Sequence, residues 1–272
     1  MTGGPLFAAA LRDRRRAWIW WAVALLVTAI MIAGSYGAVA GQASLDETFE
    51  DIPDSLRVLM GIDEDLALTS PAGYLNSQWF ANFLPMLLSI YGIGVASRLL
   101  AGEEDAGRLE LLLAHPVTRR RVFSERCRAA VLLLALLFLV PAVTLVALAP
   151  AFDLGDVGFS DLSAAHGATL ALALLHTAVT YGVGAWSGRR GVAMAAGATV
   201  MGGGFLLQSL ANVSSTLRPL RWLSPWHWFI DARPIVDGWA PLVVPSIAAA
   251  ALAAAAVVAG AWRFERRDIG AA

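Results

Sequence analysis

The sequence predicts an all-α, polytopic membrane protein with six transmembrane helices. Its mean hydropathy is +0.64, and 58% of its residues are hydrophobic while only 15% are charged, a balance well outside that of soluble domains. The apolar residues gather in six windows, each near the ~20 residues that cross a hydrocarbon core of ~30 Å. Because lipid cannot satisfy backbone polar groups, each window is expected to be a helix. The windows cover residues 17–40, 79–100, 129–151, 164–186, 192–212 and 239–262.

A short basic segment precedes the first window. Residues 5–16 combine apolar positions with arginines, which suits an elbow helix lying at the membrane interface beside Trp18 and Trp20. The alternative is a basic flank that only sets the topology. A cleaved signal peptide is disfavoured, because the first window is longer than the roughly 7–15 apolar residues of such a peptide.

Arginine placement predicts the orientation of the chain. If the N-terminus lies inside, sixteen arginines fall on inside segments and only four fall outside, which is the bias expected for cytoplasmic loops. The first outer loop, residues 41–78, is acidic. Residues 1–272 are therefore expected to form one transmembrane domain with both termini in the cytoplasm. Its long loops are the inner loop 101–128 and the outer loops 41–78 and 213–238.

The composition argues against an enzyme. The chain has no lysine, so it lacks the lysine that a P-loop places on the β/γ-phosphates and the amine that forms Schiff bases. Its one cysteine, Cys127, provides neither a disulfide nor a zinc cluster. Ser224, His227 and Asp231 lie close together in sequence but do not match a nucleophile elbow. We expect no catalytic residue, bound metal or cofactor in this chain.

The inner loop 101–128 is the most structured of the predicted loops. Three acids, Glu103 to Asp105, precede a short amphipathic helix over residues 108–114, and acids stabilise a helix N-terminus by ~0.3–1 kcal/mol each. Leucines 109, 112 and 113 are predicted to form an exposed apolar stripe that needs a partner or the membrane surface. Thr118 can cap the third span. The alternative is an ordinary charged loop that obeys the positive-inside bias.

This loop, GEEDAGRLELLLAHPVTRRR from residue 102 to 121, resembles the coupling segment of the type-2 family of ABC exporter permeases. The PAGYLNSQ stretch at 71–78, the FERRD tail at 264–268 and the LSPWHWF run at 223–229 fit the resemblance more weakly. It implies that the loop docks on a separate ATPase, although Arg108 and His115 depart from the usual small or hydroxyl residues. The implied coupling residues are Glu103, Glu104, Asp105, Gly107, Arg108, Leu109, Leu112, Leu113, Pro116 and Arg119.

The same resemblance implies the partners and the cargo. The partners would be the cognate ABC ATPase, which holds ATP and magnesium, a second copy of the permease or a related permease, and the lipid bilayer, with no nucleic acid. The expected location is a bacterial cell membrane, and the cargo would be a hydrophobic or amphipathic drug, antibiotic or lipid moved out of the cytoplasm. A secondary transporter or a membrane scaffold that needs no ATPase is the alternative.

Several polar residues lie within the apolar windows. Polar groups in lipid are expensive and usually face protein or a cavity, so these residues are candidates for a substrate path. The alternative for each is an interhelical hydrogen bond, worth ~0.6 kcal/mol on average. The candidates are Asn82, Tyr91, His176, Tyr181, Gln208 and Asn212.

Overall fold

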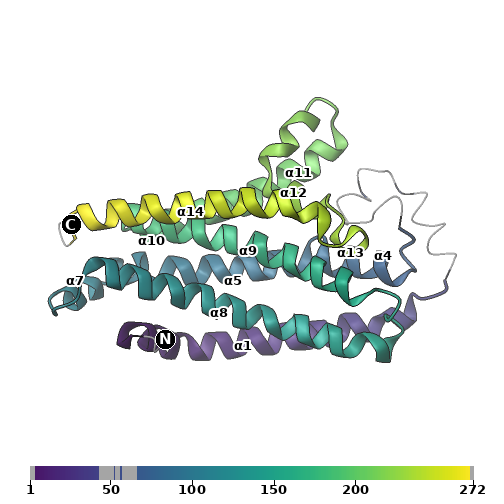
Figure 1. The fold of residues 1–272 in the computed structure, drawn as a ribbon, viewed down its shortest axis with the longest axis horizontal. Coiled ribbons are helices and arrows are strands. Elements are labelled where there is room, and N and C mark those ends of the chain that lie inside the picture. The colour runs from purple at the N-terminus through teal and green to yellow at the C-terminus, as the bar shows by residue number, and fades with distance from the viewer. Residues whose placement is uncertain (1–3, 43–51, 53–55, 57–65, 270–272) are drawn as a thin grey trace.

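The computed structural model describes residues 4–42, 52, 56 and 66–269. Its regular elements in this part of the chain are all helical, and six helical stretches are long and apolar enough to span a membrane, which confirms the predicted fold class. These spans lie side by side in one elongated bundle (Figure 1). They are Pro5–Ala38, Pro71–Leu99, Arg119–Phe152, Phe159–Ser187, Arg190–Val213 and Ala240–Arg266.

Several of the spans contain more than one helical element. The first span consists of α1 (Pro5–Ser35) and η1 (Tyr36–Ala38). The second consists of α4 (Pro71–Leu75), η2 (Asn76–Phe80) and α5 (Phe83–Leu99). The third consists of α8 (Arg119–Leu148) and η3 (Ala149–Phe152). The last three are α9 (Phe159–Ser187), then α10 (Arg190–Ala198), η4 (Thr199–Gly203) and α11 (Gly204–Val213), then η6 (Ala240–Leu242) and α14 (Val243–Arg266). Between spans lie α6 (Ala101–Asp105), α7 (Arg108–Leu113), η5 (Arg218–Leu223), α12 (Pro225–Ile230) and α13 (Pro234–Asp237).

Local sequence signals explain where several helices begin. Pro5 and Pro71 stand at the first positions of α1 and α4, where the missing proline N–H costs nothing. The hydroxyl of Ser70 accepts a hydrogen bond from the Gly73 amide at 3.1 Å. Thr118 caps α8 in the same way, as predicted, by accepting from the Arg121 amide at 3.3 Å. These starts lie outside the apolar windows, so the helices are longer than hydropathy alone predicts.

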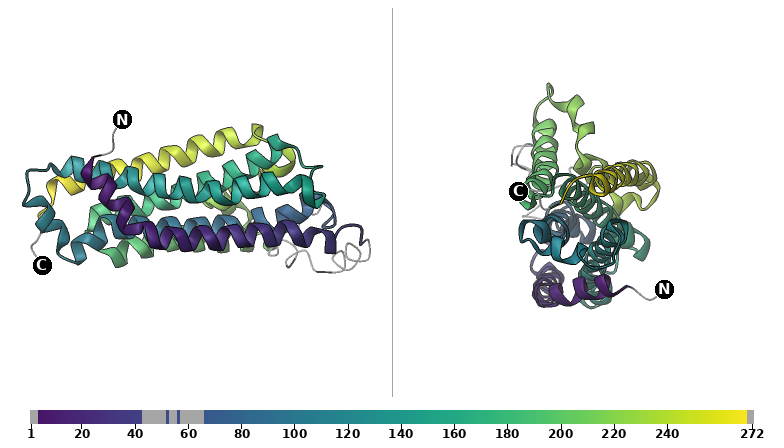
Figure 2. Two further views of the ribbon diagram at one scale, coloured as in Figure 1. Left: turned by 90° about the horizontal axis from the view of Figure 1, so that it is seen from below. Right: turned by 90° about the vertical axis from the view of Figure 1, so that its left-hand side faces the viewer.

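The predicted elbow is not a separate helix. α1 runs without a break from Pro5 to Ser35, and its first turns are angled away from the remainder (Figure 2). Between Pro5 and Gly34 the sequence holds neither proline nor glycine, the residues that most readily interrupt a helix. The basic flank and the first apolar window therefore form one continuous element.

The helices α5 and α9 form the centre of the bundle. Their spans are the most buried of the six, and α9 packs extensively against both α5 and α14, while α1 packs on α8. Small residues allow a close approach of two backbones: a Cβ added to Gly182 of α9 would lie 2.2 Å from the carbonyl oxygen of Ala256 in α14. Such small-residue contacts are typical of membrane helix pairs.

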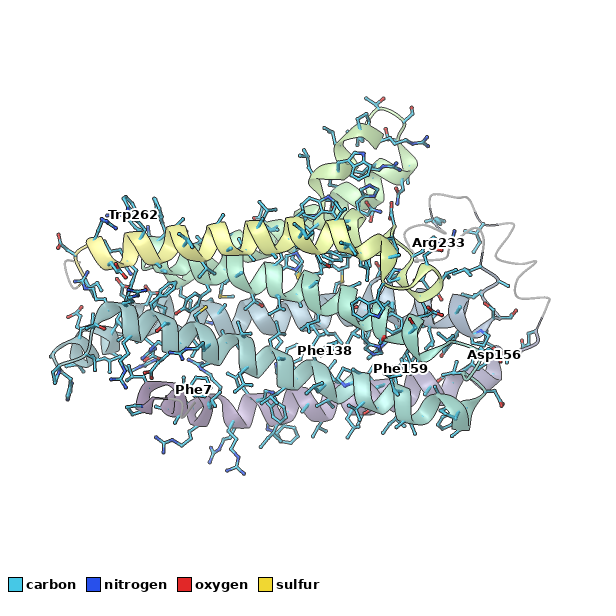
Figure 3. All side chains as sticks on the ribbon, viewed as in Figure 1. Phe7, Phe138, Asp156, Phe159, Arg233 and Trp262 are labelled. Carbon is cyan, nitrogen blue, oxygen red and sulfur yellow. The ribbon has the colours of Figure 1, made fainter. Side chains whose placement is uncertain are left out.

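The two ends of the bundle differ in character. The start of α1, the helices α6 and α7, and the end of α14 gather at one end, which we call the arginine-rich end (Figures 1 and 2). Phe7 and Trp262 lie toward it, whereas Asp156 and Arg233 lie toward the opposite end (Figure 3). α11 and the segment after it project from one side of the bundle (Figure 1). The predicted inner loop and both chain ends thus lie together.

Candidate functional site: the arginine-rich end

The predicted acidic cluster forms a helix of its own. Glu103 and Glu104 lie in the first turn of α6, while Gly107, at a φ of 68°, separates α6 from α7. Glycine adopts this left-handed conformation without the strain that a side chain would add. The amphipathic helix is present at Arg108–Leu113 as predicted, but the acids do not stand at its N-terminus. They face arginines instead.

Glu103 meets arginines from three elements. Its carboxylate lies 2.8 Å from Arg108 of α7, 3.7 Å from Arg126 of α8 and 3.8 Å from Arg14 of α1. Burial raises the pKa of Glu103, but the hydrogen bond from Arg108 and the charges of Arg126, Arg108 and Arg14 outweigh that effect and lower the pKa below its usual 4.5. Glu103 therefore joins the first and third spans to the inner loop as a carboxylate.

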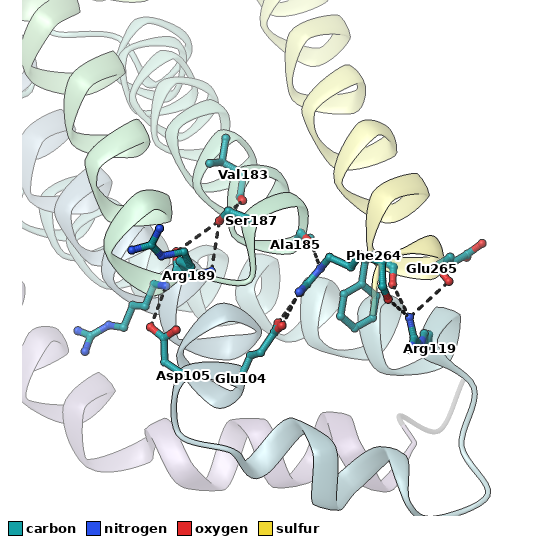
Figure 4. A network of polar contacts seen from close by, with 11 residues as sticks. Glu104, Asp105, Arg119, Val183, Ala185, Ser187, Arg189, Phe264 and Glu265 are labelled. Carbon is teal, nitrogen blue, oxygen red and sulfur yellow. Dashed lines mark hydrogen bonds and ion pairs between the residues drawn. The ribbon is translucent and has the colours of Figure 1, made fainter. Parts of the chain in front are cut away.

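Glu104 and Asp105 reach the remaining spans. Glu104 forms a bidentate ion pair with Arg267, just after α14, and the Arg267 Nε donates to the Ala185 carbonyl of α9 at 3.0 Å. The Asp105 carboxylate accepts from the Arg190 amide at the start of α10 at 2.9 Å. Figure 4 shows both acids beside the turn that carries Ser187 and the beginning of the fifth span.

Two arginines of α8 bind the C-terminal ends of other helices. Arg119 donates to the carbonyl oxygen of Phe264 in α14 at 3.3 Å (Figure 4), and Arg126 donates to that of Leu99 in α5. Both positions suit a cation, because a helix C-terminus presents unpaired carbonyl groups and partial negative charge. Together with the acids, these arginines connect the same ends of all six spans to residues 101–128.

The outward face of α7 differs from the predicted one. Leu109 is fully buried, and Leu112 and Leu113 pack partly against the core, so the expectation of an exposed leucine stripe is wrong. Their helical spacing does form one apolar face, but that face turns inward. Leu111, with 70% of its surface exposed, points outward instead.

The exposed side of this turn is hollowed. A cavity of about 440 Å³ is lined by Glu110, Leu113, Ala114 and Arg119, together with Val117 and Ile269. Glu110, Ala114 and His115 are also exposed. We call the exposed residues Glu110, Leu111, Ala114 and His115, with this cavity, the docking face.

Four of the six candidate path residues, Tyr91, His176, Tyr181 and Gln208, contact different partners. Tyr91 packs against Trp21, with ring centroids 5.7 Å apart, and the His176 Nδ1 lies 2.8 Å from the Ser89 hydroxyl. The Tyr181 hydroxyl donates to the Phe123 carbonyl at 2.7 Å. The remaining three are Asn82 and Asn212, which are half-buried, and Gln208, whose amide donates to Asp231. These contacts join neighbouring helices and do not gather the six residues at one point.

The family of the chain follows from comparison with known families. Residues 4–264 match the model described as "Multidrug efflux system permease Rv1217c, C-terminal domain". The chain belongs to this efflux permease family. No curated protein matches its sequence. The match covers almost all of the described helices, so the six apolar spans are those of a multi-pass efflux permease, a transport subunit rather than an enzyme.

The permease also has a polar cluster toward the opposite end. His227 Nδ1 lies 2.6 Å from an oxygen of Asp231, and the Gln208 amide donates to the other oxygen. Ser224 does not join them: its hydroxyl donates to the Gly204 carbonyl at 2.7 Å and caps α12. The Ser224 hydroxyl and the His227 ring therefore have separate partners.

Sequence reasoning missed the arginines that complete the site. Arg14, Arg126, Arg190 and Arg267 were assigned only to membrane orientation, because each is an inside arginine near the end of a span. The structure pairs the guanidinium groups of Arg14 and Arg126 with Glu103 and that of Arg267 with Glu104, while Arg190 donates its backbone amide to Asp105. The available signal was the excess of arginines near three consecutive acids, but it does not say which arginine meets which acid.

Proposed function

We propose that this permease is the membrane subunit of an ATP-driven ABC exporter of the type-2 kind. A separate ATPase would bind the docking face, and two permease subunits, identical or related, would enclose the path. The cargo would be hydrophobic or amphipathic and would leave the cytoplasm. Family membership supports efflux; the ATPase and the cargo class are our inference.

The observation that supports this proposal most is the set of links made by residues 101–128. Glu103 contacts α1, α7 and α8, Glu104 contacts the end of α14, and Asp105 contacts the start of α10. A displacement of this segment would act on the first, third, fifth and sixth spans through these contacts, on the second through Arg126 and Leu99, and on the fourth through Arg267 and Ala185. A scaffold that only sits in the membrane has no need of such a junction.

The docking face supplies the surface on which a partner can act. Leu111 is 70% exposed and follows Glu110, which lines the cavity together with Arg119. A single exposed leucine is ordinary on a protein surface, so Leu111 supports the proposal only together with the cavity beside it. Glu103, Glu104 and Asp105 form their ion pairs and hydrogen bonds within the chain. They hold the segment in place, and Leu111 stays available to contact the partner.

In the proposed mechanism the partner binds the nucleotide and the permease supplies the spans that move. The chain has no lysine for a P-loop, so ATP and magnesium would bind to the partner. Nucleotide-driven closure of two ATPases would press on each docking face, and the differential affinity of nucleotide for the two states would shift the spans between inward- and outward-facing arrangements. The arginine-rich end is cytoplasmic in this proposal.

Co-purification tests the partnership. Tagged permease is solubilised from its host and the retained proteins are identified, for the wild type and for Glu110→Arg combined with Leu111→Asp. Both residues are exposed, so the variant should fold, yet it should lose the ATPase. Asp13→Arg, an exposed acid on α1 at the same end, is the matched control and should retain it.

Two outcomes would contradict the proposal. If no ATPase accompanies the wild type, while efflux by the same cells still depends on the permease, the secondary-transporter alternative replaces this proposal. If the ATPase stays bound to the double variant, the docking face is misplaced. Efflux measured in parallel separates these outcomes from a loss of expression.

A further inference from the structure

We propose that a cavity toward the opposite end of the bundle binds an organic cation with an apolar body. The cavity measures about 430 Å³ and lies between η5, α12 and the beginning of α14. This volume is within the ~300–1,000 Å³ of sites that bury a small molecule. The residues used in the argument are Trp222, His227, Trp228, Asp231, Val244 and Ala248.

One carboxylate gives this cavity its charge. Asp231 is the single acidic residue among the described residues that line it, and no arginine lines it. Gln208 and His227 each bond one carboxylate oxygen, which fixes the side chain while 31% of it stays exposed. A carboxylate has about four acceptor positions, so two bonds leave room for a cationic ligand.

Two tryptophan side chains, Trp222 and Trp228, line the cavity. Trp228 donates its Nε1–H to the Trp222 carbonyl at 2.8 Å, which holds η5 against α12. The Trp222 ring packs edge-to-face on His227, with centroids 4.6 Å apart. Tryptophan faces attract cations more strongly than other aromatic faces, and aromatic side chains grouped around a site recognise quaternary ammonium groups. The Arg221 guanidinium already lies over the Trp222 ring, 5.8 Å from its centroid.

The remaining wall is apolar. Val244, Pro245 and Ala248 of α14 line the same cavity as the tryptophans, and Val244 is 75% exposed. An apolar lining that includes one fixed carboxylate suits a molecule that combines hydrophobic groups with one positive charge. An anion of the same shape would be repelled by Asp231. The site is argued from these contacts alone and does not depend on the ATPase partnership.

Tetraphenylphosphonium and tetraphenylborate test the proposal, because they have nearly the same shape and opposite charge. Purified permease in phosphatidylcholine nanodiscs is titrated with each radiolabelled ion, and empty nanodiscs correct for partition into lipid. The cation should bind saturably and the anion should not. Asp231→Asn should weaken binding of the cation about tenfold, an effect moderated by the partial exposure of the carboxylate.

Two further variants make the result specific. Asp237→Asn removes an exposed acid from α13 that does not line the cavity and should leave binding unchanged. Val244→Trp fills the cavity from an exposed position, leaves the carboxylate in place and should abolish binding. Equal binding of both ions, or unchanged binding in Asp231→Asn and Val244→Trp, would overturn the proposal. Since no ATPase is present, failure here is distinct from failure of the coupling proposal.

Discussion

At the scale of single residues, the pair formed by Glu104 and Arg267 is the strongest test of the junction. The two side chains are only 14% and 9% exposed, so removing one charge leaves the other poorly solvated. We expect Glu104→Gln to lower the free energy of unfolding by about 2 kcal/mol. Thermal unfolding in nanodiscs measures this, with the exposed Glu110→Gln as the control that should change stability little.

Glu103 makes the stability of the permease depend on pH. Its pKa is lowered in the folded protein, chiefly by Arg108 and Arg126, which outweigh burial. Its stabilising contribution is therefore present above the usual value of 4.5 and is lost as the pH falls through the lowered pKa. We expect the stability difference between wild type and Glu103→Gln to be full near pH 7 and to shrink below about pH 4.5.

Thermal unfolding of both proteins across this range gives the comparison. A difference that stays constant, or that grows on acidification, would show that Glu103 does not act as a paired carboxylate. The variant Glu103→Asp keeps the charge but shortens the side chain, and it should retain the direction of the pH dependence.

The roles of individual residues were predicted unevenly from the sequence. Thr118 was identified as a helix cap because its position before a helical run is a local signal. Leu109 was assigned to an exposed stripe, yet it is fully buried, because spacing shows which residues share a face but not which way the face turns. The partners of Arg267 depend on contacts between distant segments, and no local pattern encodes them.

At the scale of elements, the backbone contact at Gly182 is expected to control the packing of α9 on α14. A Cβ at Gly182 would lie 2.2 Å from the Ala256 carbonyl oxygen, and one at Gly260 would lie 2.5 Å from that of Gly182. Backbone atoms cannot move aside as a flexible side chain can. We expect Gly182→Ala to separate the helices and lower stability by about 1–3 kcal/mol.

Gly94→Ala is the matched control for this prediction. Gly94 also lies within a spanning helix, α5, but a Cβ there meets no atom within 4 Å. Its substitution should be neutral or slightly stabilising, since alanine favours helix more than glycine does. Thermal unfolding of both variants makes the comparison, and equal effects would contradict the close contact.

The elements themselves were well predicted where composition decides them. All six apolar windows correspond to spanning helices, because lipid leaves few alternatives to a helix. The sequence did not predict that the basic segment 5–16 and the first apolar window form one helix. The change from charged to apolar residues looks like a boundary, although the helix continues across it. The π-helical turns Asn76–Phe80 and Thr199–Gly203 were missed too, because they depend on local hydrogen-bond register rather than on residue type.

At the scale of the whole molecule, the sequence predicts more about topology than about the substrate path. Apolar length and arginine counts are summed over many residues, so single errors matter little. A path is made by a few side chains on different helices, and its residues cannot be read from any one segment; the candidates Tyr181 and Gln208, for example, contact Phe123 and Asp231 on different elements. The distribution of charge therefore gives the most direct whole-molecule prediction.

That prediction concerns which end of the bundle faces the cytoplasm. Cys127 is the one cysteine of the chain, so Cys127→Ala gives a background free of thiols. Into it, Glu110→Cys places a thiol on α7 at the arginine-rich end, and Asp156→Cys places one toward the opposite end (Figure 3). Both positions are exposed. We expect a membrane-impermeant maleimide to label the Asp156→Cys protein in intact cells and the Glu110→Cys protein only after lysis. The reverse pattern would put the docking face outside the cell, where no ATP-driven partner could reach it, and labelling of both in intact cells would show that the bundle does not separate the two ends across the membrane.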